Sequence, residues 1–98
     1  MNYWKNVQYR DVVIKERERE IRWLYNILRI EGIENKFKFI RNPQIEKLSS
    51  MTEHLCVQIG EREKIIFQRN QEISFLREIF EENDLSSFYI REWWDEKY

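Results

Sequence analysis

A single heptad pattern runs without a change of phase through residues 45–83, IEKLSSMTEHLCVQIGEREKIIFQRNQEISFLREIFEEN. Its core positions recur in alternating steps of three and four. β-Branched residues occupy most of the first core positions and Leu several of the second, as in coiled coils. The helix would be about 60 Å long. Only another helix lying along it would bury such a stripe, so the pattern predicts a coiled-coil helix over residues 44–83.

The composition of the chain is typical of a helical protein. Its 98 residues include only two Gly and one Pro, and 36% are charged. The 17 basic and 18 acidic residues leave a net charge of −1, which gives no whole-chain field for attracting nucleic acid or an anionic membrane. Cys56 is the only cysteine, which excludes an intrachain disulfide. No apolar run has the length of a transmembrane span. These features favour a soluble intracellular protein, in the cytoplasm or nucleus.

The rest of the chain divides around this helix. Residues 1–31 predict a first amphipathic helix that stops at Gly32, a residue favoured just past helix ends. Residues 32–43 form the connection, with Asn42 as the expected N-cap of the long helix and Pro43 at its start. Gly60 lies inside the long helix but does not interrupt the heptad phase. Residues 84–98 are rich in aromatics and form a tail or a short third helix.

The two predicted helices resemble each other at an offset of 52 residues. Seven positions of the first helix are identical to their counterparts in the second: Arg10, Ile14, Arg17, Glu20, Ile21, Leu24 and Ile27. A duplicated helical unit would explain these identities, and a shared heptad pattern is the alternative explanation. Copies of a unit that cannot bury its own face would pack on each other or on a second chain.

Arginines in the core positions are the most specific feature of the pattern. Arg10 and Arg17 in the first helix match Arg62 and Arg69 in the second. A buried guanidinium needs an acidic partner, because its desolvation costs several kcal/mol. In a parallel dimer of identical helices, Arg62 would face Arg62, which favours an antiparallel pair in which flanking acids receive the arginines. The alternative is that the middle of each helix faces solvent.

We therefore predict an all-α fold: a helical hairpin with a long heptad-patterned second helix, which forms an antiparallel coiled-coil or helical-bundle dimer. The first helix is expected to fold back on the start of the long helix. In that pairing the end of the first helix packs on the start of the second: Ile21, Leu24 and Leu28 against Ile45, Leu48, Met51 and Leu55.

The sequence predicts binding surfaces rather than an active site. His54 and Cys56 lie two residues apart, on different faces of a helix, and no motif for a metal, a cofactor or catalysis is present. The predicted function is a non-catalytic coiled-coil scaffold that binds a second copy or another helical protein. Its expected oligomer interface is Val7, Ile14, Ile21, Leu24, Leu28, Ile59, Arg62, Ile66, Arg69, Ile73, Leu76 and Phe80, and its expected partner-binding residues are Phe88, Trp93 and Trp94.

An alternative function uses the basic and aromatic residues of the connection. Residues 36–41, KFKFIR, alternate basic and apolar side chains, which suits stacking on bases and contact with phosphates. A small dimeric nucleic-acid-associated regulator is therefore the second hypothesis, which the near-neutral charge of the chain disfavours.

Overall fold

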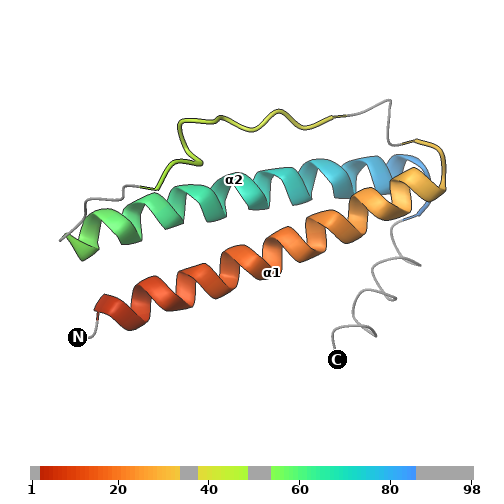
Figure 1. Cartoon of the computed structure of the whole chain (residues 1–98). Helices are drawn as coiled ribbons and strands as arrows, with labels where there is room; N and C mark the ends of the chain where they lie inside the picture. Colours follow the sequence, from red (N-terminus) through yellow and green to blue (C-terminus); the bar gives the residue numbers. More distant parts are fainter. Residues whose placement is uncertain (1–2, 34–37, 49–53, 86–98) are drawn as a thin grey trace.

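Two long helices make up the regular structure of the chain (Figure 1). The computed structural model describes residues 3–33, 38–48 and 54–85. Helix α1 spans Tyr3–Ile30 and helix α2 spans Leu55–Glu82, and the described residues form no strand. The helices pack along each other for most of their length. The predicted all-α fold with two packed helices is thereby confirmed.

The two helices run in the same direction (Figure 1). Arg10 near the start of α1 contacts Glu63 near the start of α2, and Glu20 contacts Arg77 further along both helices. Residues 31–54 join the two helices, and residues 38–48 of this connection lie along α2. A helix of 28 residues is about 42 Å long, a distance that an extended segment of this length spans easily. Within one chain the pairing is thus parallel, whereas a first helix that folds back on the start of the long helix would have been antiparallel to it.

The core lies at the end of the pair where both helices terminate. It contains equal contributions from the two helices, and Leu28, Leu76 and Phe80 have no exposed surface. Each buried side chain of α1 in this cluster has its counterpart 52 residues later in α2. The buried members are Ile21, Leu24, Ile27, Leu28, Ile73, Leu76, Ile79 and Phe80.

The structure repeats the 52-residue offset in its helix bounds and in the turns that follow. Tyr3 and Ile30 become Leu55 and Glu82 when 52 is added, so the two helices coincide in this frame. The chain then leaves both helices through the same left-handed turn, with a positive φ of 74° at Gly32 and 57° at Asp84. An αL residue just past the last helical turn is a common helix end.

The hydrogen bonds of the two turns also correspond. The amide of Ile33 donates to the carbonyl of Leu28 at 2.9 Å, and the amide of Leu85 donates to the carbonyl of Phe80 at 2.8 Å. Ile33 and Leu85 both pack on the core cluster. The repeat therefore extends beyond the heptad pattern into the irregular turns, and an approximate twofold axis relates the two halves.

The long helix begins later than predicted, at Leu55 rather than at residue 44. Asn42 does not cap it. Its side-chain Oδ1 accepts a hydrogen bond from the amide of Gln44 at 3.0 Å, and residues 43–46 form a turn. The turn is stabilised by α2 itself, because Gln68 accepts a hydrogen bond from the amide of Asn42 at 2.8 Å. A continuous helix from residue 44 would remove these contacts.

The predicted pairing of the core was wrong for the same reason. The apolar end of α1 packs on Ile73, Leu76 and Phe80 at the end of α2. Ile45 and Leu48 belong to the connection, where Leu48 is exposed, and Leu55 is the first residue of α2. Met51 lies outside the described residues.

Truncation of the core should lower the stability of the paired helices. We expect Leu76→Ala to reduce the free energy of unfolding by about 2–5 kcal/mol, because the side chain is fully buried and leaves a cavity. Val12→Ala is the control, since Val12 is 54% exposed, and it should cost well below 1 kcal/mol. Urea unfolding followed by circular dichroism measures both. Equal losses in the two variants would contradict the burial of Leu76 between the helices.

Candidate functional site

Reciprocal ion pairs join the two helices near their starts. Arg10 donates from Nη2 to Oε1 of Glu63 at 2.8 Å, and Arg62 donates from Nε to Oδ1 of Asp11 at 2.7 Å. Arg62 is the counterpart of Arg10, and Glu63 that of Asp11. Each of these two arginines therefore pairs with the acidic residue that directly follows the other arginine on the opposite helix. Arg10 and Arg62 are thus not required to face each other.

The second pair of arginines, Arg17 and Arg69, also binds side chains at equivalent positions of the opposite helix, but only one of these contacts is an ion pair. Arg69 donates to Oε1 of Glu18 from Nη2 at 3.1 Å, whereas Arg17 donates to Oδ1 of Asn70 from Nε at 2.9 Å. Asn70 takes the place of an acid on α2, so only Arg69 gains an ion pair here. The Arg69 side chain is also only 5% exposed, while Arg17 is half-buried.

A third level of contacts lies nearer the core. Glu20 accepts a hydrogen bond from Nη2 of Arg77 at 2.8 Å, and its counterpart Glu72 accepts one from the Tyr25 hydroxyl at 2.9 Å. Both glutamates are buried. The two contacts are again related by the offset of 52, because Arg77 is the counterpart of Tyr25. Once the offset of 52 is removed, the partner lies five positions after the glutamate in both contacts. This spacing is typical of ion and hydrogen-bond pairs between two parallel helices.

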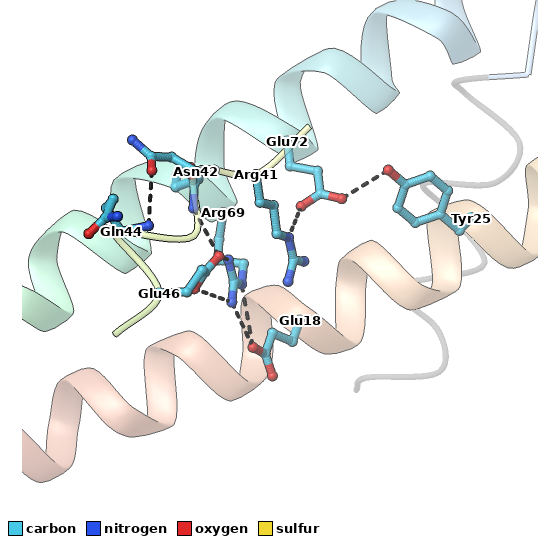
Figure 2. Close-up of polar contacts among 9 residues, drawn as sticks. Glu18, Tyr25, Arg41, Asn42, Gln44, Glu46, Arg69 and Glu72 are labelled. Carbon is cyan, nitrogen blue, oxygen red and sulfur yellow. Dashed lines mark hydrogen bonds and ion pairs between the residues drawn. The ribbon is translucent and has the colours of Figure 1, made fainter. Parts of the chain in front are cut away.

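The connection adds a second layer of polar contacts on one side of the pair (Figure 2). Glu46 receives two hydrogen bonds from the Arg69 guanidinium, one of them from Nη2 to Oε2 at 2.9 Å. Arg41 donates from Nε to Oε1 of Glu72 at 2.7 Å, opposite the oxygen that binds Tyr25. Arg69 thus lies between carboxylates of α1 and of the connection. Among the described residues, every buried side-chain nitrogen and oxygen has a hydrogen-bond partner.

This network changes the acidity of its members. Burial would raise the pKa of the Glu46 carboxyl, but the hydrogen bonds and charge of Arg69 outweigh burial and lower it. Burial would likewise lower the pKa of the Arg69 guanidinium, and Glu46 and Glu18 raise it instead. The charged forms are therefore the ones that the fold stabilises.

Tyr25 shows the opposite effect on a neutral group. Burial, followed by the hydrogen bond to Glu72 and the charge of that carboxylate, raises the pKa of the Tyr25 phenol to about 12. The phenol is therefore a hydrogen-bond donor under ordinary conditions and is unsuited to act as a base near neutral pH.

The residues predicted as an oligomer interface lie between α1 and α2 of one chain. Five of them are almost fully buried there: Val7, Leu24, Leu28, Leu76 and Phe80. Ile21, Ile73 and Arg69 are buried as well, and the remaining four (Ile14, Ile59, Arg62 and Ile66) are half-buried. The predicted contact surface is thus used within the chain, and its use between chains stays a prediction. The predicted partner-binding residues Phe88, Trp93 and Trp94 lie outside the described residues.

The basic connection is partly engaged in packing, although Ile40 is 87% exposed. Phe39 packs on Phe75 of α2 with ring centroids 5.8 Å apart, and Arg41 is bound by Glu72. Lys38 is exposed, and Lys36 and Phe37 lie outside the described residues. Two of the side chains that would contact nucleic acid under the second hypothesis are therefore held by the protein itself.

Some of the residues in this site were missed by the sequence analysis. Glu46 was assigned to the long helix, and Arg41 was considered only for phosphate contact. The sequence does contain a signal for the contacts between the helices. Arg77, the partner of Glu20, corresponds in the repeat to Tyr25, five residues after Glu20. Tyr25, the partner of Glu72, corresponds to Arg77, five residues after Glu72, and this spacing is typical of pairs between parallel helices. No pattern in the sequence indicates that the connection would contribute Glu46 and Arg41.

Comparisons with known proteins give no relative. No protein-family model matches the chain, and neither a curated protein nor a solved structure matches it. Within the described residues, no three metal-ligating side chains come together, and Cys56 is exposed. In that same part of the chain no helix has the length and apolar character needed to cross a membrane.

Removing the charge of Glu46 should weaken the fold at neutral pH and reduce its sensitivity to acid. Because the folded-state pKa of Glu46 lies below 4.5, its contribution is present above that pH and is lost as the pH falls through the folded-state value. We expect Glu46→Gln to lower the free energy of unfolding by about 1–3 kcal/mol at pH 7, and the difference from wild type to close in acid. Urea unfolding between pH 7 and pH 3 measures this.

Glu63→Gln provides the matched control for this experiment. Glu63 also pairs with an arginine, but its side chain is 58% exposed, so the loss should stay below about 1 kcal/mol. A Glu46→Gln loss that is constant over the whole pH range would contradict the assigned pairing with Arg69.

The Tyr25 phenol should ionise late in an alkaline titration. Its neutral form stabilises the fold fully below pH 10, and that contribution is lost as the pH rises through about 12. Absorbance of tyrosinate should show a step near pH 12 that is missing in Tyr25→Phe. Identical alkaline profiles of the two proteins would show that the contact with Glu72 does not hold the phenol proton.

Proposed function

We propose that the chain is a non-catalytic module for protein–protein interaction, in which a second copy binds the outer face of α2. The paired helices supply a rod of fixed register, because their core and arginine contacts are made within one chain. Contacts with a partner then fall to the outer faces of the rod rather than to the heptad core.

The observation that carries this proposal is an apolar hollow on the outside of α2. Phe67 is 63% exposed, although aromatic side chains of this size usually gain from burial. The hollow beside it has a volume of ≈ 370 Å³ and is lined by Phe67, Asn70, Gln71, Ser74, Phe75 and Glu78. An exposed aromatic side chain at a hollow with a polar rim is typical of a protein-contact surface.

A second copy is the partner that fits this surface most simply. A symmetric dimer brings the same patch of both copies together, so that Phe67 of one chain would insert beside Phe75 of the other. The near-neutral net charge of −1 imposes little repulsion between two copies.

The mass of the protein in solution tests the proposal. Light scattering over a concentration series should show a species of twice the 12.4 kDa chain mass. Phe67→Ser should return the mass to that of one chain without loss of helicity, because the side chain lies outside the core. Val12→Ser is the control, since Val12 is an exposed apolar residue on the outer face of α1 and its replacement should leave the dimer intact.

Two results would overturn the proposal. A mass of one chain at all concentrations would show that the hollow does not bind a second copy. A dimer that survives Phe67→Ser would show that the copies meet elsewhere.

A further inference from the structure

A row of exposed side chains runs along the outer face of α2. Lys64, Phe67, Gln71, Ser74 and Glu78 follow one another in steps of three and four residues, so they lie on one face of the helix. All of them are exposed, and all except the lysine line the hollow beside Phe67. The hollow is therefore part of a longer surface that carries one basic and one acidic residue.

The two ends of this row carry opposite charges. Lys64 and Glu78 each lie seven residues from Gln71, which is two helical turns or about 10.5 Å to either side. Within the described part of the chain, neither of the two charged side chains has an ion-pair partner. Both charges are thus available to a partner that binds at the hollow.

This order of charges favours one direction for a second copy. If two α2 helices met in parallel about a twofold axis, Lys64 would face Lys64 and Glu78 would face Glu78, and both contacts would be repulsive. If they met antiparallel with the axis at Gln71, Lys64 of each copy would face Glu78 of the other. The charges are therefore complementary only in the antiparallel pair.

The hollow agrees with the same register. In the proposed dimer Phe67 of one copy lies beside Phe75 of the other, and these residues lie four positions on either side of Gln71. The axis that pairs the charges is therefore also the axis that brings the exposed ring to the hollow. Moving the partner by one turn along α2 would separate Lys64 from Glu78 and also Phe67 from Phe75.

The connection holds one wall of the hollow in place. Phe39 packs on Phe75 with ring centroids 5.8 Å apart, and Arg41, two residues later, binds Glu72 through Nε at 2.7 Å. The Phe75 ring is thereby fixed beside the hollow within each chain. A second copy meets a surface that is already formed, which lowers the entropy cost of binding.

One like-charged contact opposes this register. Glu61 and Glu81 lie ten residues on either side of Gln71, so they would face each other toward the ends of the contact. Glu61 already has an interaction within its own chain, and salt screens charges at an exposed rim. Parallel pairing would not remove the repulsion, because each glutamate would then face its own copy.

We propose that two copies of the chain associate through antiparallel α2 helices, with the twofold axis at Gln71 and Lys64 of each copy paired with Glu78 of the other. This arrangement rests on the proposed dimer and adds the residues that determine its direction and register. Phe67 supplies apolar contact, and the two exposed ion pairs select the orientation, because complementary charges contribute more to specificity than to affinity.

Reversal of either charge tests the arrangement in the full chain. Lys64→Glu and Glu78→Lys should each raise the dissociation constant of the dimer about tenfold or more, because each replaces two attractive contacts by two repulsive ones. Light scattering over a concentration series measures the dissociation constant, and circular dichroism verifies that helicity is retained. Lys15→Glu is the matched control, since Lys15 is an exposed lysine of α1, and it should leave the dimer unchanged.

Combining the two reversals should restore association. At a concentration where each variant alone has the mass of one chain, an equimolar mixture of Lys64→Glu and Glu78→Lys should have twice that mass, because every facing pair is again of opposite charge. The double variant Lys64→Glu/Glu78→Lys should likewise form a dimer by itself, with a dissociation constant within a few-fold of that of the wild type.

The outcomes separate this arrangement from the dimer itself. A wild-type mass of one chain at all concentrations would overturn both. A dimer that requires Phe67 but is unaffected by either charge reversal would overturn the antiparallel register and leave the dimer standing. Parallel pairing gives that second result, because Lys64 and Glu78 would face like charges before and after each change. Folded variants that remain single chains when mixed would also overturn the pairing of Lys64 with Glu78.

Discussion

A buried guanidinium determines how the two helices fit together. Arg69 occupies a core position of α2 with a side chain only 5% exposed, and it is held by Glu18 of α1 and Glu46 of the connection. A buried charge without such partners costs several kcal/mol. A shift of one heptad along the pair, or a reversal of α1, would remove Glu18 from Arg69. Direction and register thus follow from a few ionic contacts, whereas the apolar core alone would tolerate other arrangements.

The approximate symmetry is broken at Arg17 and Arg69, because only one of their two equivalent partner positions holds an acidic residue. Asn70 stands at the position that Glu18 holds on the other helix, so Arg17 receives an amide oxygen and Arg69 a carboxylate. The connection adds Glu46 beside Arg69, so the Arg69 guanidinium has two carboxylate partners and is buried. Arg17, with a neutral partner, remains half-buried. The difference in burial between the two arginines is therefore a consequence of their partners.

Heptad phase was enough to predict both helices as paired elements, and the repeat at 52 residues indicated their correspondence. The direction of pairing within the chain was predicted incorrectly, because the first helix was expected to fold back through residues 32–43 onto a long helix beginning at residue 44. In the structure Arg62 pairs with Asp11 on α1, so parallel helices bring no repulsion between Arg10 and Arg62. The start of α2 was also misplaced, because Ile45 and Leu48 fit the heptad phase. Tertiary contacts of Asn42 and Glu46 with α2 override that local pattern, and no property of residues 42–48 taken alone reveals them.

Parallel pairing inside one chain requires a return segment as long as the helices, and that requirement shapes the rest of the molecule. Residues 31–54 form a connection about four times longer than a typical turn between helices, yet two doublings of loop length cost only about 1.2 kcal/mol in closure entropy. A single charged hydrogen bond such as that between Arg41 and Glu72 offsets a cost of this size. The return segment therefore does more than join the helices. By binding Glu72, Gln68 and Arg69, it covers the buried polar groups of α2 that a bare two-helix rod would leave to water.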